Sequence, residues 1–110
     1  MGKDPVTLRH RFLEHIEKHW EQNDHCLKSI PAVYAMIAYD FFDKSSDIVY
    51  FGSTTNLFLR YKSHKIPKKI QDSGKINILF FLPMDKGFYD YEMKLIRRLK
   101  PAYNRQHKDE

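Results

Sequence analysis

The chain has 110 residues, of which 42% are hydrophobic and 30% are charged, a composition typical of one small folded domain. Its apolar run at 32–38 is too short to cross a bilayer, and its single cysteine excludes an internal disulfide bond. Residues 1–12 lack the apolar core of a secretory signal, so we expect a cytoplasmic protein that does not bind membranes.

The formal net charge of +5 comes mainly from two segments. Segment 53–76 has six basic residues against one acidic residue, and segment 94–108 has six basic residues and no acidic one. Basic clusters attract polyanions because each neutralised phosphate releases counterions, which favours nucleic acid as the partner. The alternative is a solvated face of Lys and Arg side chains.

The first segment, 4–23, has the pattern of an amphipathic helix. Its apolar residues recur at four-residue steps: Leu8, Phe12, Ile16 and Trp20. Asp4 is expected to cap this helix, with Pro5 at its first position. We therefore expect residues 1–30 to form a helical extension that packs on a domain at 31–110.

The same segment contains histidines that are candidates for a zinc site. His15 and His19 are four residues apart, and His25 and Cys26 follow. The string EHIEKH does not match the zinc pattern HExxH, because Glu14 and Glu17 stand at other positions. Surface histidines on a helix are the preferred interpretation.

The middle of the chain predicts two neighbouring strands. Residues 32–39 are almost continuously apolar, which is typical of a strand buried on both faces. Segment 40–47 reads as a long hairpin connection, and 48–52 reads as the return strand, with Gly52 allowing a sharp exit. Tyr34 and Tyr50 are then on adjacent antiparallel strands.

A helix is expected at 56–65, where Asn56, Arg60 and His64 are four residues apart and share one face. Pro67 is expected to end it, and 68–74 is expected to be a basic polar loop. Residues 76–83 predict a third strand that ends at a proline.

The last predicted helix, 88–99, has an apolar stripe that contains Glu92. A partly buried carboxylate without a partner costs several kcal/mol, so Glu92 needs a cation. Arg60, a lysine and a bound divalent metal are all candidates. Together the elements predict a mixed α/β (α+β) domain with a three-stranded antiparallel sheet flanked by helices.

Several of these residues recur in an order known from one family. AVY at 32–34, YFG at 50–52, Arg60 eight residues after Gly52, His64, Glu92 and KPAYN at 100–104 resemble the GIY-YIG nuclease domain. The resemblance covers residues 32–104 and implies the family's small three-stranded sheet. The chain departs from the family pattern at Ala32, Val33 and Phe51, and its connection at 35–49 is longer than usual.

The resemblance implies a DNA endonuclease that hydrolyses phosphodiester bonds in one step with Mg²⁺ or Mn²⁺. Glu92 would bind the metal, Arg60 the phosphate, and Tyr34 would activate the water by passing its proton to His64. Tyr50 would orient the water or the phosphate, and Asn104 would support the site. The expected nucleic-acid contacts are Gly52, Asn56, Lys62, Lys65, Lys68, Lys69, Arg97, Arg98 and Arg105.

Two other functions fit the sequence: a catalytically inactive nucleic-acid-binding module of the same fold, and a protein-interaction domain that uses the helix at 4–23. Taken singly, Tyr34 and Tyr50 are also typical packing aromatics. The expected substrate is duplex or branched DNA. Cutting both strands with one site per chain requires either self-association or two successive nicks.

Overall fold

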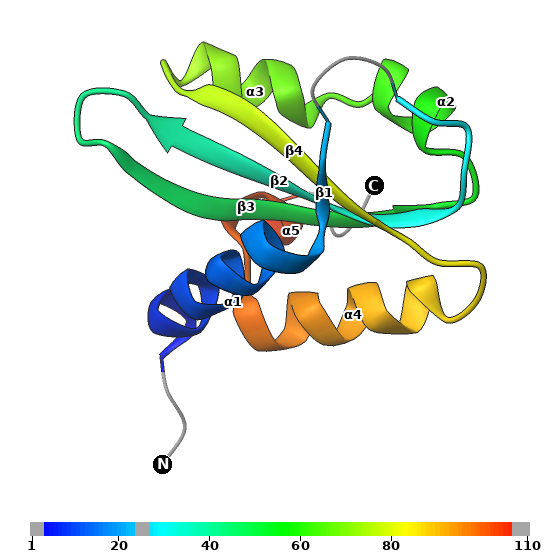
Figure 1. Cartoon of the computed structure of the whole chain (residues 1–110). Coiled ribbons are helices and arrows are strands. Elements are labelled where there is room, and N and C mark those ends of the chain that lie inside the picture. The colour runs from blue at the N-terminus through cyan, green and yellow to red at the C-terminus, as the bar shows by residue number, and fades with distance from the viewer. Residues whose placement is uncertain (1–3, 24–26, 107–110) are drawn as a thin grey trace.

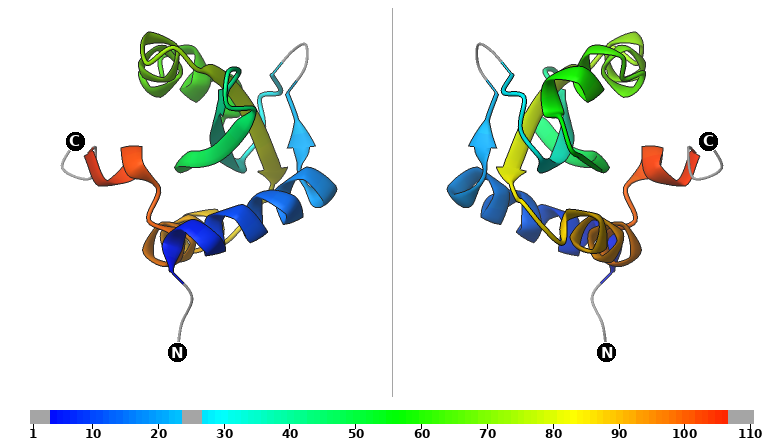
Figure 2. Two further views of the ribbon diagram at one scale, coloured as in Figure 1. Left: turned by 90° about the vertical axis from the view of Figure 1, so that its left-hand side faces the viewer. Right: turned by 90° about the vertical axis from the view of Figure 1, so that its right-hand side faces the viewer.

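The structure is a computed structural model that describes residues 4–23 and 27–106, with side chains described up to residue 104. A four-stranded antiparallel sheet lies between two layers of helices (Figures 1 and 2). The strand order is β1-β4-β2-β3, and the strands are β1 Glu21–Gln22, β2 Ala32–Asp40, β3 Ser45–Thr54 and β4 Ile76–Pro83. The α+β class is as predicted, whereas the prediction of three strands is wrong.

The helices divide between the two faces of the sheet. Helices α1 Pro5–His19 and α4 Phe88–Leu99 cover one face, and α2 Leu57–Lys62 and α3 Ile66–Asp72 cover the other (Figure 1). The short helix α5, Ala102–Gln106, lies beside the edge strand β3. None of the described helices is long and apolar enough to cross a membrane.

Helix α1 begins where the sequence predicts. Asp4 caps it, because its Oδ1 accepts a hydrogen bond from the Thr7 backbone N–H at 2.9 Å, and Pro5 occupies the first turn. The helix ends at His19, since Trp20 has an extended backbone, and the prediction that it continues to residue 23 is wrong. Residues 21–22 instead pair with Phe81 and Phe80 and form the fourth strand.

Strand β2 is central and buried on both faces, as its apolar run predicts. Successive side chains of a strand point to opposite faces, so the strand contributes to two cores. Val33, Ala35 and Ile37 pack in the core on the α1/α4 side. Tyr34 and Met36 pack in the core on the α2/α3 side.

The connection between β2 and β3 is shorter than predicted. The turn occupies only residues 41–44, and Asp40 stabilises it by accepting hydrogen bonds from the backbone N–H groups of Phe42 and Asp43 at 3.0 and 3.1 Å. The pairing of β2 with β3 shifts its register between Met36 and Ile37, which is a local irregularity of the β-bulge kind. Gly52 does not provide an exit from β3, because the strand continues to Thr54.

The segment that the sequence assigns to a loop at 68–74 is mostly helical. Helix α2 ends at Lys62, and Pro67 does not end a helix but stands in the first turn of α3. Proline is favoured there because the first N–H groups of a helix have no intrahelical acceptor. Ile66 and Ile70, one turn apart, are both buried against the sheet.

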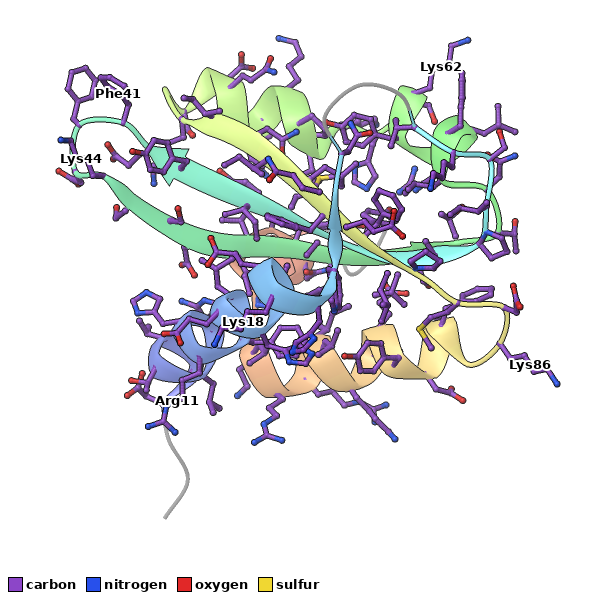
Figure 3. The ribbon with its side chains drawn as sticks, viewed as in Figure 1. Arg11, Lys18, Phe41, Lys44, Lys62 and Lys86 are labelled. Carbon is purple, nitrogen blue, oxygen red and sulfur yellow. The ribbon has the colours of Figure 1, made fainter. Side chains whose placement is uncertain are left out.

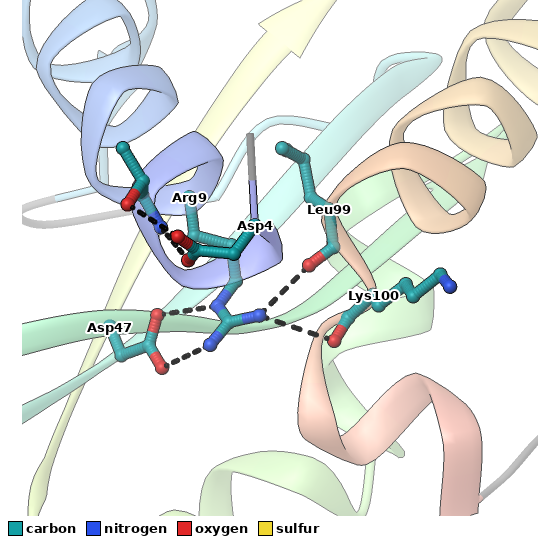
Figure 4. A network of polar contacts seen from close by, with 6 residues as sticks. Asp4, Arg9, Asp47, Leu99 and Lys100 are labelled. Atoms are coloured by element: carbon teal, nitrogen blue, oxygen red, sulfur yellow. Dashed lines mark hydrogen bonds and ion pairs between the residues drawn. The ribbon is translucent and has the colours of Figure 1, made fainter. Parts of the chain in front are cut away.

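Arg9 joins three elements on the other side of the molecule (Figure 4). Its Nε donates to Asp47 Oδ1 of β3 at 2.8 Å, and its Nη1 donates to the backbone oxygen of Leu99 at 2.9 Å. Lys100, the C-cap of α4, has a left-handed backbone with φ 47°. The guanidinium thus fixes the end of α4, from which α5 departs.

Candidate functional site

Tyr34 lies directly over Gly52 at the end of the sheet next to α2. The two residues face each other across the β2–β3 pair, and a Cβ atom on Gly52 would be 2.3 Å from Tyr34 Cζ. Only glycine leaves room for this ring, which is 1% exposed. The glycine of YFG is therefore explained by packing, and its contact with nucleic acid stays a prediction.

Three aromatic rings meet at this point. The ring centroids of Tyr34 and Tyr50 are 6.3 Å apart, and the His64 ring lies 5.8 Å from Tyr34 and 4.8 Å from Tyr50. His64 Nδ1 accepts a hydrogen bond from the Ile66 backbone N–H at 3.2 Å. This bond assigns the proton of a neutral His64 ring to Nε2.

Arg60 of α2 brings a positive charge to the two phenols. Burial raises the pKa of Tyr34, the neighbouring Tyr50 raises it further, and the charge and hydrogen bonding of Arg60 lower it in part. The net pKa lies above the ordinary range of tyrosine, so the phenol of Tyr34 is neutral at physiological pH.

Glu92 approaches from α4, on the other side of β3. Ser53 Oγ of β3 donates a hydrogen bond to Glu92 Oε1 at 2.5 Å. Burial raises the pKa of Glu92, and the Ser53 bond and the charge of Arg60 only partly oppose this shift. Glu92 also acts electrostatically on Tyr34, so the five predicted side chains gather around the end of β3.

Ser53 is a member of this cluster that sequence reasoning did not find. Its bond to Glu92 joins residues 39 positions apart, and no local pattern indicates such a contact.

Asn104 contacts the strand and not the ring cluster. Its Nδ2 donates to the backbone oxygen of Phe51 and its Oδ1 accepts from the backbone N–H of Phe51, both at 2.8 Å. Asn104 is buried, and it satisfies both polar groups of a residue on the outer strand. It thereby fixes the backbone between Tyr50 and Gly52.

The predicted nucleic-acid contacts are spread over several surfaces. Asn56 caps α2 by accepting from the Leu59 N–H at 3.1 Å, and Lys65 is the N-cap of α3. Lys62 lies over the Phe58 ring at 5.9 Å and Lys69 over the Tyr103 ring at 4.8 Å.

The remaining predicted contacts are on α3, on α4 and after α4. Lys68 pairs with Asp72 at 3.3 Å, and Arg97 and Arg98 stand in the last turn of α4. The side chain of Arg105 lies outside the described part of the chain. Lys86, which is not among the predicted contacts, lies at the same end of the molecule as Lys62 (Figure 3).

The donor set fits a magnesium site with a single protein carboxylate. Mg²⁺ commonly keeps several waters and is held by one or two carboxylates together with substrate phosphates. Glu92 has one oxygen bonded to Ser53 and a pKa raised by burial, so a nearby cation would stabilise its charged form. Within residues 4–23 and 27–106 there is no group of three or more His, Cys, Asp or Glu side chains placed to hold a metal.

Of the four candidate ligands of a zinc site, the structure describes two. The rings of His15 and His19 are 4.6 Å apart on α1, and His25 and Cys26 lie outside the described residues.

Comparison of the chain with family models, with curated proteins and with solved structures gives no match. The candidate function is therefore inferred from the geometry of the ring cluster and its charged neighbours.

Proposed function

We propose that the protein is a Mg²⁺- or Mn²⁺-dependent endonuclease of the GIY-YIG type that hydrolyses phosphodiester bonds in DNA. The observation that supports this proposal is the convergence of two phenols, an imidazole, a guanidinium and a carboxylate around the end of β3. The groups come from β2, β3, α2, the segment after α2, and α4. Their residue types and order are those in which the sequence resembles the family.

Arg60 and Glu92 supply the charges that such a reaction needs. The guanidinium of Arg60 is planar and exposed, and in our proposal it donates hydrogen bonds to the non-bridging oxygens of the phosphate. Glu92 would hold the metal ion, which when bound offers positive charge to the phosphate and the leaving oxygen. Tyr34 and Tyr50 keep Arg60 at the end of the sheet.

The phenols have different roles in this proposal. Tyr34 is buried and its raised pKa keeps it protonated, so in this proposal it acts as a hydrogen-bond donor and does not have the water-activating role that the family resemblance implies. Tyr50 is less buried and orients the attacking water. His64 accepts a proton at Nδ1 only if its bond from Ile66 breaks, so we assign it an orienting role, with the proton of the water passing to solvent.

The test is nicking of supercoiled plasmid by the purified chain, with and without Mg²⁺. We expect Mg²⁺-dependent nicking that falls at least about 100-fold in Glu92→Gln, because removing one electrostatic group from a site of this kind typically costs that much. Asp90→Asn, on the exposed side of the same helix, is the matched control and should cut like the parent.

DNA binding separates the proposal from its main alternative. Glu92→Gln should retain DNA affinity that weakens with added salt, since the lysines and arginines are unchanged. Salt-dependent binding without nicking of duplex, branched or single-stranded DNA by the parent chain would instead establish an inactive binding module. Absence of salt-dependent binding would favour the protein-interaction domain.

A further inference from the structure

The β2–β3 hairpin ends in two adjacent exposed aromatic side chains. Phe41 is 64% exposed and Phe42 is 89% exposed, and their rings meet edge to face with centroids 6.1 Å apart. Figure 3 shows Phe41 and Lys44 at the end of the molecule opposite Lys62 and Lys86. Scattered exposed apolar residues are ordinary, but neighbouring aromatics on a protruding turn indicate a binding surface.

The backbone of this turn is held in one conformation. Asp40 Oδ1 accepts from two consecutive backbone N–H groups, and Asp40 and Ser45 form the last pair of the strands. Lys44 completes the turn with a left-handed backbone at φ 54°. The two rings are thus presented on a preorganised tip, which reduces the entropy lost when a partner binds.

The charge at the tip argues against nucleic acid and anionic membranes as partners. Residues 40–44 contain two aspartates and one lysine, in contrast to the basic segments 53–76 and 94–108, and the nearby Asp47 is already paired with Arg9. Phosphate and anionic headgroups are attracted by clusters of Lys and Arg, and acidic groups repel them. A protein partner fits this composition better.

Asp43 and Lys44, next to the two rings, form a self-complementary pair of charges. In a two-fold symmetric contact the same patch meets itself, so residue i of one copy faces residue j of the other and the reverse. Asp43 of each copy would then meet Lys44 of its neighbour, with the four phenylalanines between them. A single acidic or basic patch would not have this property.

We propose that the tip formed by residues 41–44 is a self-association surface whose occupant is the same tip of a second copy of this chain. The inference is independent of the proposed nuclease activity. Because Phe41 is 64% exposed and Phe42 is 89% exposed, burying two copies of each removes at most about 600 Å² from water, at about 200 Å² for a fully exposed ring. Stable specific interfaces start at about 1,200 Å², so we expect a weak dimer.

The first test is sedimentation velocity of the full chain from about 10 µM to about 1 mM, the range in which a weak dimer forms. We expect the sedimentation coefficient to rise with concentration, and Phe42→Ser to remain a monomer throughout. Tyr89→Ser is the matched control, because Tyr89 is 62% exposed on α4, away from the tip, and its loss should leave the association unchanged.

The second test exchanges the charges. Asp43→Lys and Lys44→Asp should each abolish self-association, because like charges then meet across the two-fold axis. An equimolar mixture of the two variants should form a heterodimer, and the double exchange should restore the homodimer. Aspartate tolerates the left-handed backbone at position 44, so Lys44→Asp leaves the turn intact.

Several results would overturn this proposal. A parent chain that stays monomeric up to about 1 mM, the top of the range tested, has no such interface. Association that persists in Phe42→Ser, or charge variants that fail to recombine, would place the contact elsewhere. Binding of the parent chain to phosphatidylglycerol vesicles that is lost in Phe42→Ser would make the tip a membrane contact instead.

Discussion

The two faces of the sheet are covered by helices that differ in length and chemistry, since α1 and α4 have 15 and 12 residues whereas α2 and α3 have 6 and 7. The core on the α1/α4 side consists of aliphatic residues with phenylalanine and tryptophan, for example Val33, Ile37 and Phe51. The core on the α2/α3 side contains the buried phenol of Tyr34, with Tyr50 and Tyr61 packed against it. Polar atoms inside a core need partners, so the second side is specialised beyond packing.

Glu92 is the exception that connects the two sides. It belongs to α4, yet it reaches Ser53 near the end of β3 and acts electrostatically on Tyr34. The α1/α4 layer thus contributes mainly stability, whereas the phenols of β2 and β3 lie together with the imidazole and the guanidinium on the α2/α3 side. The candidate site lies where the two sides meet.

The largest expected effect tests whether α1 is integral to the fold. Ile16 of α1 and Ile70 of α3 are both fully buried, one in each core. Ile16→Ala and Ile70→Ala should each lower the unfolding free energy by about 2–5 kcal/mol. Urea denaturation followed by circular dichroism measures both. A loss well below about 1 kcal/mol for Ile16→Ala would mean that the α1 layer is dispensable.

The next largest effect is expected at Gly52, which packs against the Tyr34 ring. Gly52→Ala places a Cβ 2.3 Å from the buried Tyr34 ring and should cost about 1–3 kcal/mol of stability through overpacking. In a Tyr34→Ala background the ring is absent, so the same substitution at Gly52 should cost far less. Additive losses in the urea-unfolding cycle would contradict the packing explanation.

A comparable loss is expected at the edge of β3 that α5 covers. Asn104→Ala leaves the buried N–H and oxygen of Phe51 without their side-chain partner and should cost about 1–3 kcal/mol. Asn104→Asp keeps the bond from the N–H but sets a carboxylate oxygen against the Phe51 carbonyl, so its stability should recover on acidification. Thermal unfolding of both variants across pH checks this pattern.

The smallest effect is a pH dependence that arises where the layers meet. Burial raises the pKa of Glu92 above its ordinary value of 4.5, so between the two pKa values the folded state binds more protons than the unfolded state. The unfolding free energy of the parent should therefore fall as pH rises through that window, and then level off. The difference in unfolding free energy between the parent and Glu92→Gln, measured by urea denaturation at each pH, isolates this contribution. A parent that gains stability relative to Glu92→Gln as pH rises would exclude it.

Local signals in the sequence specify much of the fold. The Asp4 cap with Pro5 and the four-residue apolar steps mark the start and the face of α1, and the apolar run at 32–39 marks the central strand. Pro67 misleads because proline both ends helices and begins them, and the spacing of Ile66 and Ile70 was the available sign of α3. Strand β1 is two residues long and exists through its pairing with β4, which no local pattern encodes.

The candidate site is likewise predicted only in part from the sequence. The resemblance to the GIY-YIG nuclease domain selects Tyr34, Tyr50, Arg60, His64 and Glu92 as one group. The packing of Tyr34 on Gly52 and the bond from Ser53 to Glu92 depend on strand register and on the placement of α4. These long-range relations become visible only in three dimensions.

The length of the β2–β3 ribbon has a consequence for assembly. From Tyr34 to Asp40 the strand advances about 20 Å at roughly 3.3 Å per residue. Two copies joined at their turns with their hairpins in line would hold their candidate sites about 40 Å apart, which is the length of about 12 base pairs of duplex at 3.4 Å each. On the two proposals made above, the hairpin would set the spacing between the two cuts, and incisions made by one such pair would be widely staggered instead of directly opposed.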